Sequence, residues 1–255
     1  MPDPSDRART CVVVPCYNEA DRLRTDEFAR FASEHREVRF LFVDDGSTDG
    51  TGAKLASLEA SDPKAFGVVS LPANRGKAEA VRQGMLRAFD EGAAYAGFWD
   101  ADLATPLDEI PRFVDTLDAH PVLEALFGSR VQLLGRVIDR RATRHYLGRV
   151  GATAISITLG LAVYDTQCGA KLFRVSPDCK ALFAEPFLAS WIFDVEIVAR
   201  MAASRRGTER PGPADVIREI PLWEWRDVAG SKVGALDFFR SMIELYRIHR
   251  RYLRG

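Results

Sequence analysis

The chain has no excess of charge of either sign. Its 255 residues carry 35 Lys and Arg against 36 Asp and Glu, which gives a formal net charge of −1. Proteins that bind nucleic acid along an extended surface are usually strongly basic, so this balance predicts no nucleic-acid partner. An anion-binding role would have to come from local clusters of basic residues.

Cysteine is scarce and is not arranged in pairs. The chain has four cysteines with no C-x-x-C spacing among them, namely Cys11, Cys16, Cys168 and Cys179. The absence of such a pair argues against a zinc module and a disulfide framework. We expect four free thiols in a reducing cytosol.

Long apolar runs are also missing. The longest one, residues 150–163, is well short of the roughly 20 residues that a membrane-spanning helix needs. The first ten residues lack the apolar stretch of a secretory signal. We therefore expect a cytoplasmic protein, whose contact with a membrane would be peripheral and on its inner face.

What is present is the composition of a soluble globular protein, with 47% hydrophobic and 28% charged residues. Apolar runs and helical patterns alternate through the first half of the chain. Strands are predicted at residues 11–14, 40–43, 66–70, 95–99 and 122–127, and helices at residues 22–35, 76–89 and 107–117, with one more capped by Ser47 or Asp49. This alternation predicts a parallel sheet with helices on both faces.

The second half is less regular. Helices are predicted at residues 140–159, 193–203 and 236–253, and strands at residues 171–175 and 216–225, the latter interrupted by proline. No linker separates two independent parts, so we predict one domain over residues 1–255.

Polar side chains recur where the predicted strands end, which is where ligands bind in such sheets. The clearest pattern is Asp100 and Asp102, one residue apart after the predicted strand 95–99. Carboxylates so close repel each other, and a divalent cation held with a nucleotide diphosphate relieves that repulsion. A solvated turn is the alternative interpretation, since Asp is a common turn residue.

Two further strand ends carry similar patterns. In FVDDGSTDGT, residues 42–51, two carboxylates precede a turn into a helix whose N-terminus can face a polar ligand. In VVPCYNEADRL, residues 13–23, Tyr17 offers a flat face for a base and Glu19 can accept from base or ribose donors. Each could also be an ordinary loop between a strand and a helix.

Together these motifs resemble the inverting family 2 glycosyltransferases, whose fold is of the GT-A type. The motifs are VVPCYNEADRL, VDDGSTDGT, LPANRGKAEAVRQG, FWDADLATP and GSR, in this order. In the second half DTQCGAKLF, WIFDVEIVAR and the spacing from Trp223 or Trp225 to Lys232 resemble the dolichyl-phosphate glucosyltransferase branch. The related polyprenyl-phosphate mannosyltransferases share much of this pattern. The resemblance covers roughly residues 10–235.

The resemblance implies an α/β GT-A fold with a mostly parallel central sheet. It implies a nucleotide-sugar half at about residues 10–130, an acceptor half at about 131–235 and a C-terminal amphipathic helix at 236–255. The donor would contact Pro15, Tyr17, Glu19, Asp44, Asp45, Lys77, Asp100, Ala101, Asp102 and Arg130. The acceptor side would include Gln167 and Lys171, and catalysis would use Asp194, Arg226 and Lys232. Mg²⁺ or Mn²⁺ would lie between Asp100 and Asp102.

Several of these residues have plain alternatives. Lys77 could be a solvated lysine at a helix start, and Asp194 could simply cap a helix. Two positions depart from the family pattern. Ala104 stands where several mannosyltransferases have Gln, which favours glucosyl over mannosyl transfer. Ala170 stands where a bulky aromatic is common, and we expect it to widen the acceptor side.

The expected reaction is transfer of a hexose, glucose from UDP-glucose in the first instance, to a polyprenyl or dolichyl-type lipid phosphate. The alternatives are GDP-mannose as donor, a non-lipid acceptor, or a sugar-nucleotide-binding protein without turnover. The C-terminal segment interleaves basic and apolar residues, as helices that lie on anionic membranes do. A core-packing helix with a solvated face is the alternative.

Overall fold

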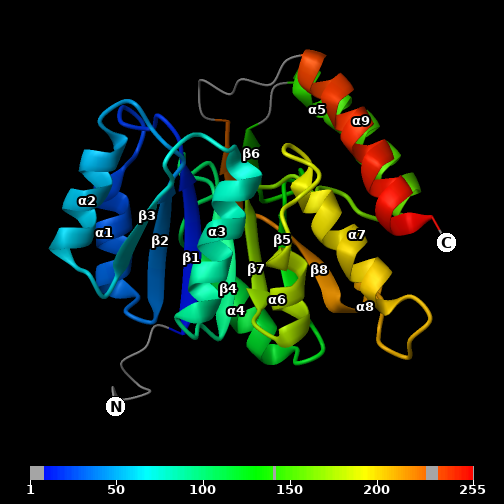
Figure 1. Cartoon of the computed structure of the whole chain (residues 1–255), viewed down its shortest axis with the longest axis horizontal. Coiled ribbons are helices and arrows are strands. Elements are labelled where there is room, and N and C mark those ends of the chain that lie inside the picture. The colour runs from blue at the N-terminus through cyan, green and yellow to red at the C-terminus, as the bar shows by residue number, and fades with distance from the viewer. Residues whose placement is uncertain (1–8, 140–141, 228–234, 255) are drawn as a thin grey trace.

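A computed structural model describes residues 9–139, 142–227 and 235–254; for residues 142–149 and 235–238 it describes the backbone path only. Its centre is a seven-stranded sheet of order β3-β2-β1-β4-β7-β5-β8 (Figure 1). The strands are β1 (Thr10–Cys16), β2 (Val38–Asp44), β3 (Phe66–Ser70), β4 (Tyr95–Trp99), β5 (Ala125–Ser129), β7 (Ala170–Arg174) and β8 (Ile217–Pro221).

The sheet is parallel apart from one strand. β7 runs antiparallel to both of its neighbours, β4 and β5. The pairs β1–β2, β1–β4, β2–β3 and β5–β8 are parallel. β1 and β2 are runs of β-branched and aromatic residues buried along almost their whole length, as expected of parallel strands covered on both faces.

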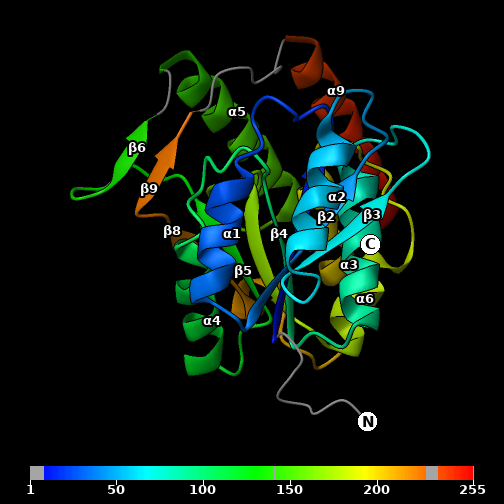
Figure 2. The same ribbon diagram turned by 90° about the vertical axis from the view of Figure 1, so that its left-hand side faces the viewer.

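Helices cover both faces of the sheet, and each face has its own apolar core. One core includes buried residues of α1 (Thr25–Glu34), α2 (Thr51–Ser61) and α4 (Glu109–Ala119). The other includes buried residues of α3 (Lys77–Asp90), α6 (Pro177–Ala184) and α7 (Phe193–Arg205). Figure 2 shows α1 and α4 on one side of the strands and α3 and α6 on the other.

The last helices form a separate layer against α7. α9 (Ala235–Ile248) and a π-helical turn, η2 (His249–Leu253), contact α7, and α5 (Ala142–Leu159) runs beside α9 (Figure 1). A small parallel ribbon pairs β6 (Val137–Asp139) with β9 (Glu224–Arg226), and α8 (Pro213–Val216) precedes β8. Among the described residues, no helix combines the length and apolarity needed to cross a membrane.

Most expected elements are confirmed, and the differences are as follows. The expected strand 216–225 is two strands, β8 and β9, in different sheets, and the expected final helix turns into η2 at its end. Helix α6 was not expected. Of the two caps expected for α2, Asp49 accepts from the Thr51 N–H at 2.9 Å at the start of the helix, although Gly50 holds the N-cap position, whereas the Ser47 hydroxyl accepts from the Asn18 N–H at 3.0 Å. Ala170 is completely buried in β7 beside Trp99, so it cannot widen an acceptor surface.

Candidate active site

Hydrogen bonds join the loops after β1 and β2 at the carboxyl edge of the sheet. Cys16 and Asp44 are register partners at the ends of these strands. The Thr48 N–H donates to the Asn18 side-chain oxygen at 2.9 Å, and the Glu19 N–H donates to the Thr51 hydroxyl at 2.8 Å. The motifs at residues 13–23 and 42–51 therefore form one surface, as the sequence predicts.

This surface contains an exposed aromatic ring and buried carboxylates. Tyr17 keeps 40% of its surface exposed, while Asp44 is buried and accepts from the Ser47 N–H at 3.0 Å. Pro15 is half-buried at the end of β1. The arrangement can receive a flat ring against Tyr17, which is the contact predicted for the donor base.

Asp45 holds the loop that leads to Lys77. Its two carboxylate oxygens accept from the Arg75 and Gly76 N–H groups at 2.7 and 2.8 Å. The neighbouring Gly46 has φ +66°, and a Cβ there would lie 2.6 Å from the Ala73 backbone, so only glycine fits. Asp45 thus sets where α3 begins, and its predicted contact with the donor remains a prediction.

Asp100 and Asp102, which follow β4, form a group that we call the acidic corner, and this group contains a lysine. Lys77 Nζ lies 2.5 Å from Asp100 Oδ1. Desolvation lowers the pKa of Lys77, but the carboxylates of Asp100 and Asp194 raise it by more, so its ammonium stays charged. The 165–169 loop also approaches the Asp100 side chain closely, because a Cβ on Gly169 would lie 1.9 Å from Asp100 Oδ2. The corner brings together residues from three distant segments.

Asp102 completes this corner. Burial raises the pKa of its carboxyl and the neighbouring Asp100 raises it further, while the Ala104 N–H donates to Asp102 Oδ1 at 3.0 Å. Ala101, between the two aspartates, is buried. No cluster of three His, Cys, Asp or Glu side chains that could hold a metal is found within the described ranges. Two carboxylates fit a hard cation that takes its remaining ligands from a diphosphate and water.

A buried ion pair lies behind the corner. Lys171 Nζ lies 2.7 Å from Asp194 Oδ1 and donates to the Cys168 carbonyl at 2.6 Å, and the lysine has no exposed surface. Burial raises the pKa of Asp194, and Lys171 and Lys77 lower it by less. Asp194 is in the first turn of α7, so its carboxylate can orient a ligand or accept a proton. Lys171 has no exposed surface, and its predicted place on the acceptor side remains a prediction.

Arg130 forms an ion pair with the buried carboxylate of Asp165. Its Nε and a terminal nitrogen donate to the two oxygens of Asp165 at 2.6 and 2.7 Å, and its guanidinium carbon lies 5.3 Å from the Trp225 ring. Desolvation lowers the pKa of Arg130, but Asp165 raises it by more. The Tyr164 and Asp165 N–H groups donate in turn to Glu219. This network fixes the 165–169 loop against Asp100.

Sequence reasoning missed Asp165 and Glu219. Asp165 opens the DTQCG motif and could have been weighed, whereas Glu219 gives no sequence signal. Of the other predicted residues, Gln167 is exposed, and Lys232 lies outside the described residues. Arg226 pairs with Glu224 at 2.5 Å and stays largely exposed. The Arg226 N–H donates to the Ala104 carbonyl, which places β9 beside the acidic corner.

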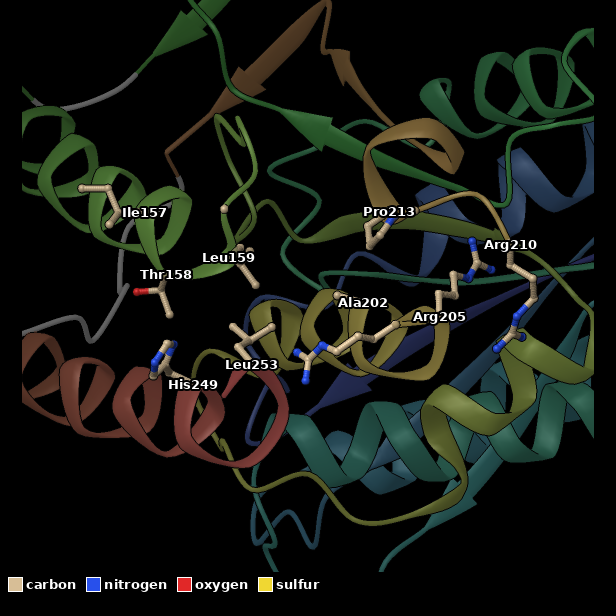
Figure 3. Close-up of a pocket in the computed structure, with 12 residues that line it drawn as sticks. Ile157, Thr158, Leu159, Ala202, Arg205, Arg210, Pro213, His249 and Leu253 are labelled. Atoms are coloured by element: carbon tan, nitrogen blue, oxygen red, sulfur yellow. The ribbon is translucent and has the colours of Figure 1, made fainter. Parts of the chain in front are cut away.

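A cavity of about 470 Å³ lies elsewhere, between α5, α7 and η2 (Figure 3). Its lining includes Arg205, Arg206, Arg210 and His249, and none of the predicted site residues. Arg206 donates to the Tyr252 carbonyl at 2.8 Å, and Arg210 pairs with Asp178 at 2.8 Å. These arginines join α7 to its neighbours and are separate from the acidic corner.

Comparison with known proteins finds several matches. The sequence profile described as "Glycosyl transferase family 2" matches residues 11–180. The dolichyl-phosphate beta-glucosyltransferase of Saccharomyces cerevisiae is 32% identical over 264 residues, which cover 96% of this chain and 75% of that protein. The corresponding protein of Dictyostelium discoideum is 31% identical and covers 99% of this chain and 77% of its own length.

Solved structures share the fold. Glucosyl-3-phosphoglycerate synthase from Mycobacterium tuberculosis, in complex with Mn²⁺, UDP-glucose and phosphoglyceric acid, superposes with a TM-score of 0.66 at 18% identity, over 95% of this chain and 80% of that one. Mannosyltransferase PcManGT from Pyrobaculum calidifontis, with GDP-Man and Mn²⁺, gives a TM-score of 0.59 at 20% identity, over 100% and 67% of the two chains. The expected GT-A fold is confirmed.

Proposed function

The chain belongs to glycosyl transferase family 2, and from that premise we propose that it transfers glucose from UDP-glucose to a polyprenyl or dolichyl phosphate with inversion. The relatives that share nearly the whole chain are named for dolichyl phosphate as acceptor and glucose as sugar. The observation that carries the proposal is the acidic corner, where Asp100 and Asp102 from the turn after β4 meet Lys77 from α3 and the Gly169 loop.

Asp100 and Asp102 are the residues that would hold Mg²⁺ or Mn²⁺. When bound, such a cation stabilises the negative charge that develops on the leaving diphosphate. Lys77 already stands 2.5 Å from Asp100 and adds a positive charge beside that diphosphate. Tyr17 and the loops after β1 and β2 would hold the nucleoside. Arg226 would add a charge from the side of β9.

The acceptor side calls for positioning more than for deprotonation. A phosphate monoester is already anionic near neutral pH, and one of its oxygens attacks C1 of the sugar as UDP leaves. Asp194 is buried, is held by Lys171 and is electrostatically linked to Lys77. We assign it the orientation of the acceptor, with uptake of a proton when the acceptor arrives protonated.

A peripheral membrane contact would bring the enzyme to a lipid-linked acceptor. The outer side of α9 exposes Phe239, Ile243 and Tyr246, and Arg247 is exposed beside them. Ile157 at the end of α5 is 77% exposed. Exposed apolar groups interleaved with arginine suit the headgroup region of an anionic membrane. The four cysteines are free and buried, which fits a reducing compartment on its cytoplasmic side.

The test is direct. The purified chain is incubated with Mn²⁺, radiolabelled UDP-glucose and a short-chain polyprenyl phosphate, with GDP-mannose and soluble sugar acceptors as parallel arms. We expect label in the lipid only with UDP-glucose. Label in a soluble sugar alone, or in the lipid only from GDP-mannose, would overturn the acceptor or the donor. Asp102→Asn should abolish transfer, whereas Asp90→Asn, an exposed acid at the far end of α3, should leave it unchanged.

A further inference from the structure

Helix α7 begins without a cap of its own. Its N-cap residue, Ile192, provides no side-chain acceptor for the free N–H groups of the preceding loop and first turn. Asp194 is the second residue of this helix. The placement of its carboxylate therefore depends on the residues that hold the 189–192 loop as well as on Lys171.

One carboxylate from another helix holds most of that loop. Glu244 of α9 accepts from the Ser190 N–H at 3.0 Å, the Ser190 hydroxyl at 2.8 Å, and the Trp191 and Ile192 N–H groups at 3.1 Å each. Glu244 is 8% exposed. Charge-assisted bonds to buried backbone donors are among the stronger ones in proteins. The loop is thus closed by a residue about fifty positions further along the chain.

The remaining loop amide is held from within α7. The Ala189 N–H donates to Glu196 at 2.8 Å, and Glu196 is itself bonded by Arg200 and by the Tyr252 hydroxyl at 3.0 Å. Glu196, which holds the Ala189 amide, is itself part of α7. Glu244 is the anchor that ties the loop to a different element.

α9 presents two unlike faces. Its inner face buries Glu244, Leu245 and Ile248, and its outer face exposes Ile243 and Tyr246. We proposed above that α9 lies against the membrane that holds the acceptor. The same helix carries Glu244, which binds the 189–192 loop before Asp194.

We propose that Glu244 is a positioning residue: by binding the Ser190–Ile192 amides it sets the start of α7, and hence the Asp194 carboxylate, against the acceptor. This inference rests on the role proposed above for Asp194. Donor binding lies on other loops, so loss of Glu244 should lower kcat for transfer and leave donor affinity alone.

The experiment compares Glu244→Gln with the parent. The amide keeps the shape of the side chain but turns an NH₂ group toward backbone donors. We expect kcat for lipid transfer to fall about 10- to 100-fold, as for a displaced positioning group, with the UDP-glucose Kd within about twofold, because the donor loops are untouched. Hydrogen exchange should accelerate in a peptide covering residues 189–193 and not in one covering α9.

Arg206→Met is the matched control. Arg206 follows α7 and donates to the Tyr252 carbonyl at 2.8 Å, so it joins α7 to η2, which continues α9, at the end far from Asp194. We expect its kcat to stay near the parent value. Should Glu244→Gln fail to fold, Ser190→Ala removes only the hydroxyl bond to Glu244, and a smaller fall in kcat with unchanged donor Kd is expected.

A Glu244→Gln kcat close to the parent value would overturn the proposal. So would an equal loss in Arg206→Met, because the effect would then be general helix docking. Asp194→Asn is measured in parallel to separate the two claims. If Asp194→Asn is inactive while Glu244→Gln is normal, the coupling alone is wrong. If Asp194→Asn keeps full activity, the proposed role of Asp194 is wrong, and Glu244 cannot act on transfer through it.

Discussion

Replacing Lys171 by Met removes the partner of a buried carboxylate. Lys171 has no exposed side-chain surface, and Asp194 keeps 9% of its own. Breaking a buried ion pair on one side typically costs about 3–5 kcal/mol, because the remaining charge is neither solvated nor paired. The Cys168 carbonyl also loses its donor. We expect Lys171→Met to lower the free energy of unfolding at pH 7 by about that amount.

The double variant Lys171→Met/Asp194→Asn separates charge from packing. With the side chain at position 194 neutral, most of the lost stability should return, whereas transfer should be lost because the Asp194 carboxylate is gone. Urea unfolding at pH 7 measures both effects as shifts in midpoint at constant m-value. A loss below about 1 kcal/mol in Lys171→Met, or no recovery in the double variant, would refute the buried-pair reasoning.

The stability lost in Lys171→Met should depend on pH in a direction that follows from the pKa of Asp194. Burial raises the pKa of Asp194 above its unfolded value, with Lys171 opposing the rise. A raised carboxyl pKa favours folding below the unfolded pKa, and that contribution is lost as pH rises through the folded pKa. Without Lys171 the pKa rises further, so the stability deficit of Lys171→Met should be smaller at acidic pH than at pH 7.

The other predictions concern the acidic corner and its support. In Gly169→Ala the new Cβ must displace Asp100, so kcat should fall at least about 100-fold, whereas Gly151→Ala, where a Cβ meets nothing within 4 Å, should stay active; equal activities would contradict the close approach. Arg130→Lys cannot form the paired bonds to Asp165 and should lose about 1.5–3 kcal/mol in urea unfolding. Chelation with EDTA should stop transfer and Mn²⁺ should restore it; transfer that survives chelation would exclude the metal.

The first half of the fold follows from local pattern. β1 to β4 are short apolar runs separated by amphipathic helices, so their existence and the meeting of their carboxyl ends could be predicted. The place of β7 could not, because an antiparallel strand between β4 and β5 is decided by pairing between distant segments. The residues 171–175 indicate a strand and nothing about its neighbours.

The site divides in the same way. Asp100 and Asp102 could be identified because they stand together after one strand. The burial of Lys171 against Asp194, and the carboxylates of Glu219 and Glu244 that hold site loops, depend on contacts across tens of residues. A single acidic residue inside a strand or an amphipathic helix gives no distinct signal in the sequence until its partners are known.

The central claim is that Asp100 and Asp102 hold a cation which grips the diphosphate of the sugar donor. Anomalous diffraction from crystals grown with Mn²⁺ and UDP-glucose tests it most directly. The account predicts one manganese peak in contact with the Asp102 carboxylate and the donor diphosphate, with Lys77 turned toward a phosphate oxygen. A donor bound with its diphosphate away from residues 100–102, or manganese held at another place, would contradict it.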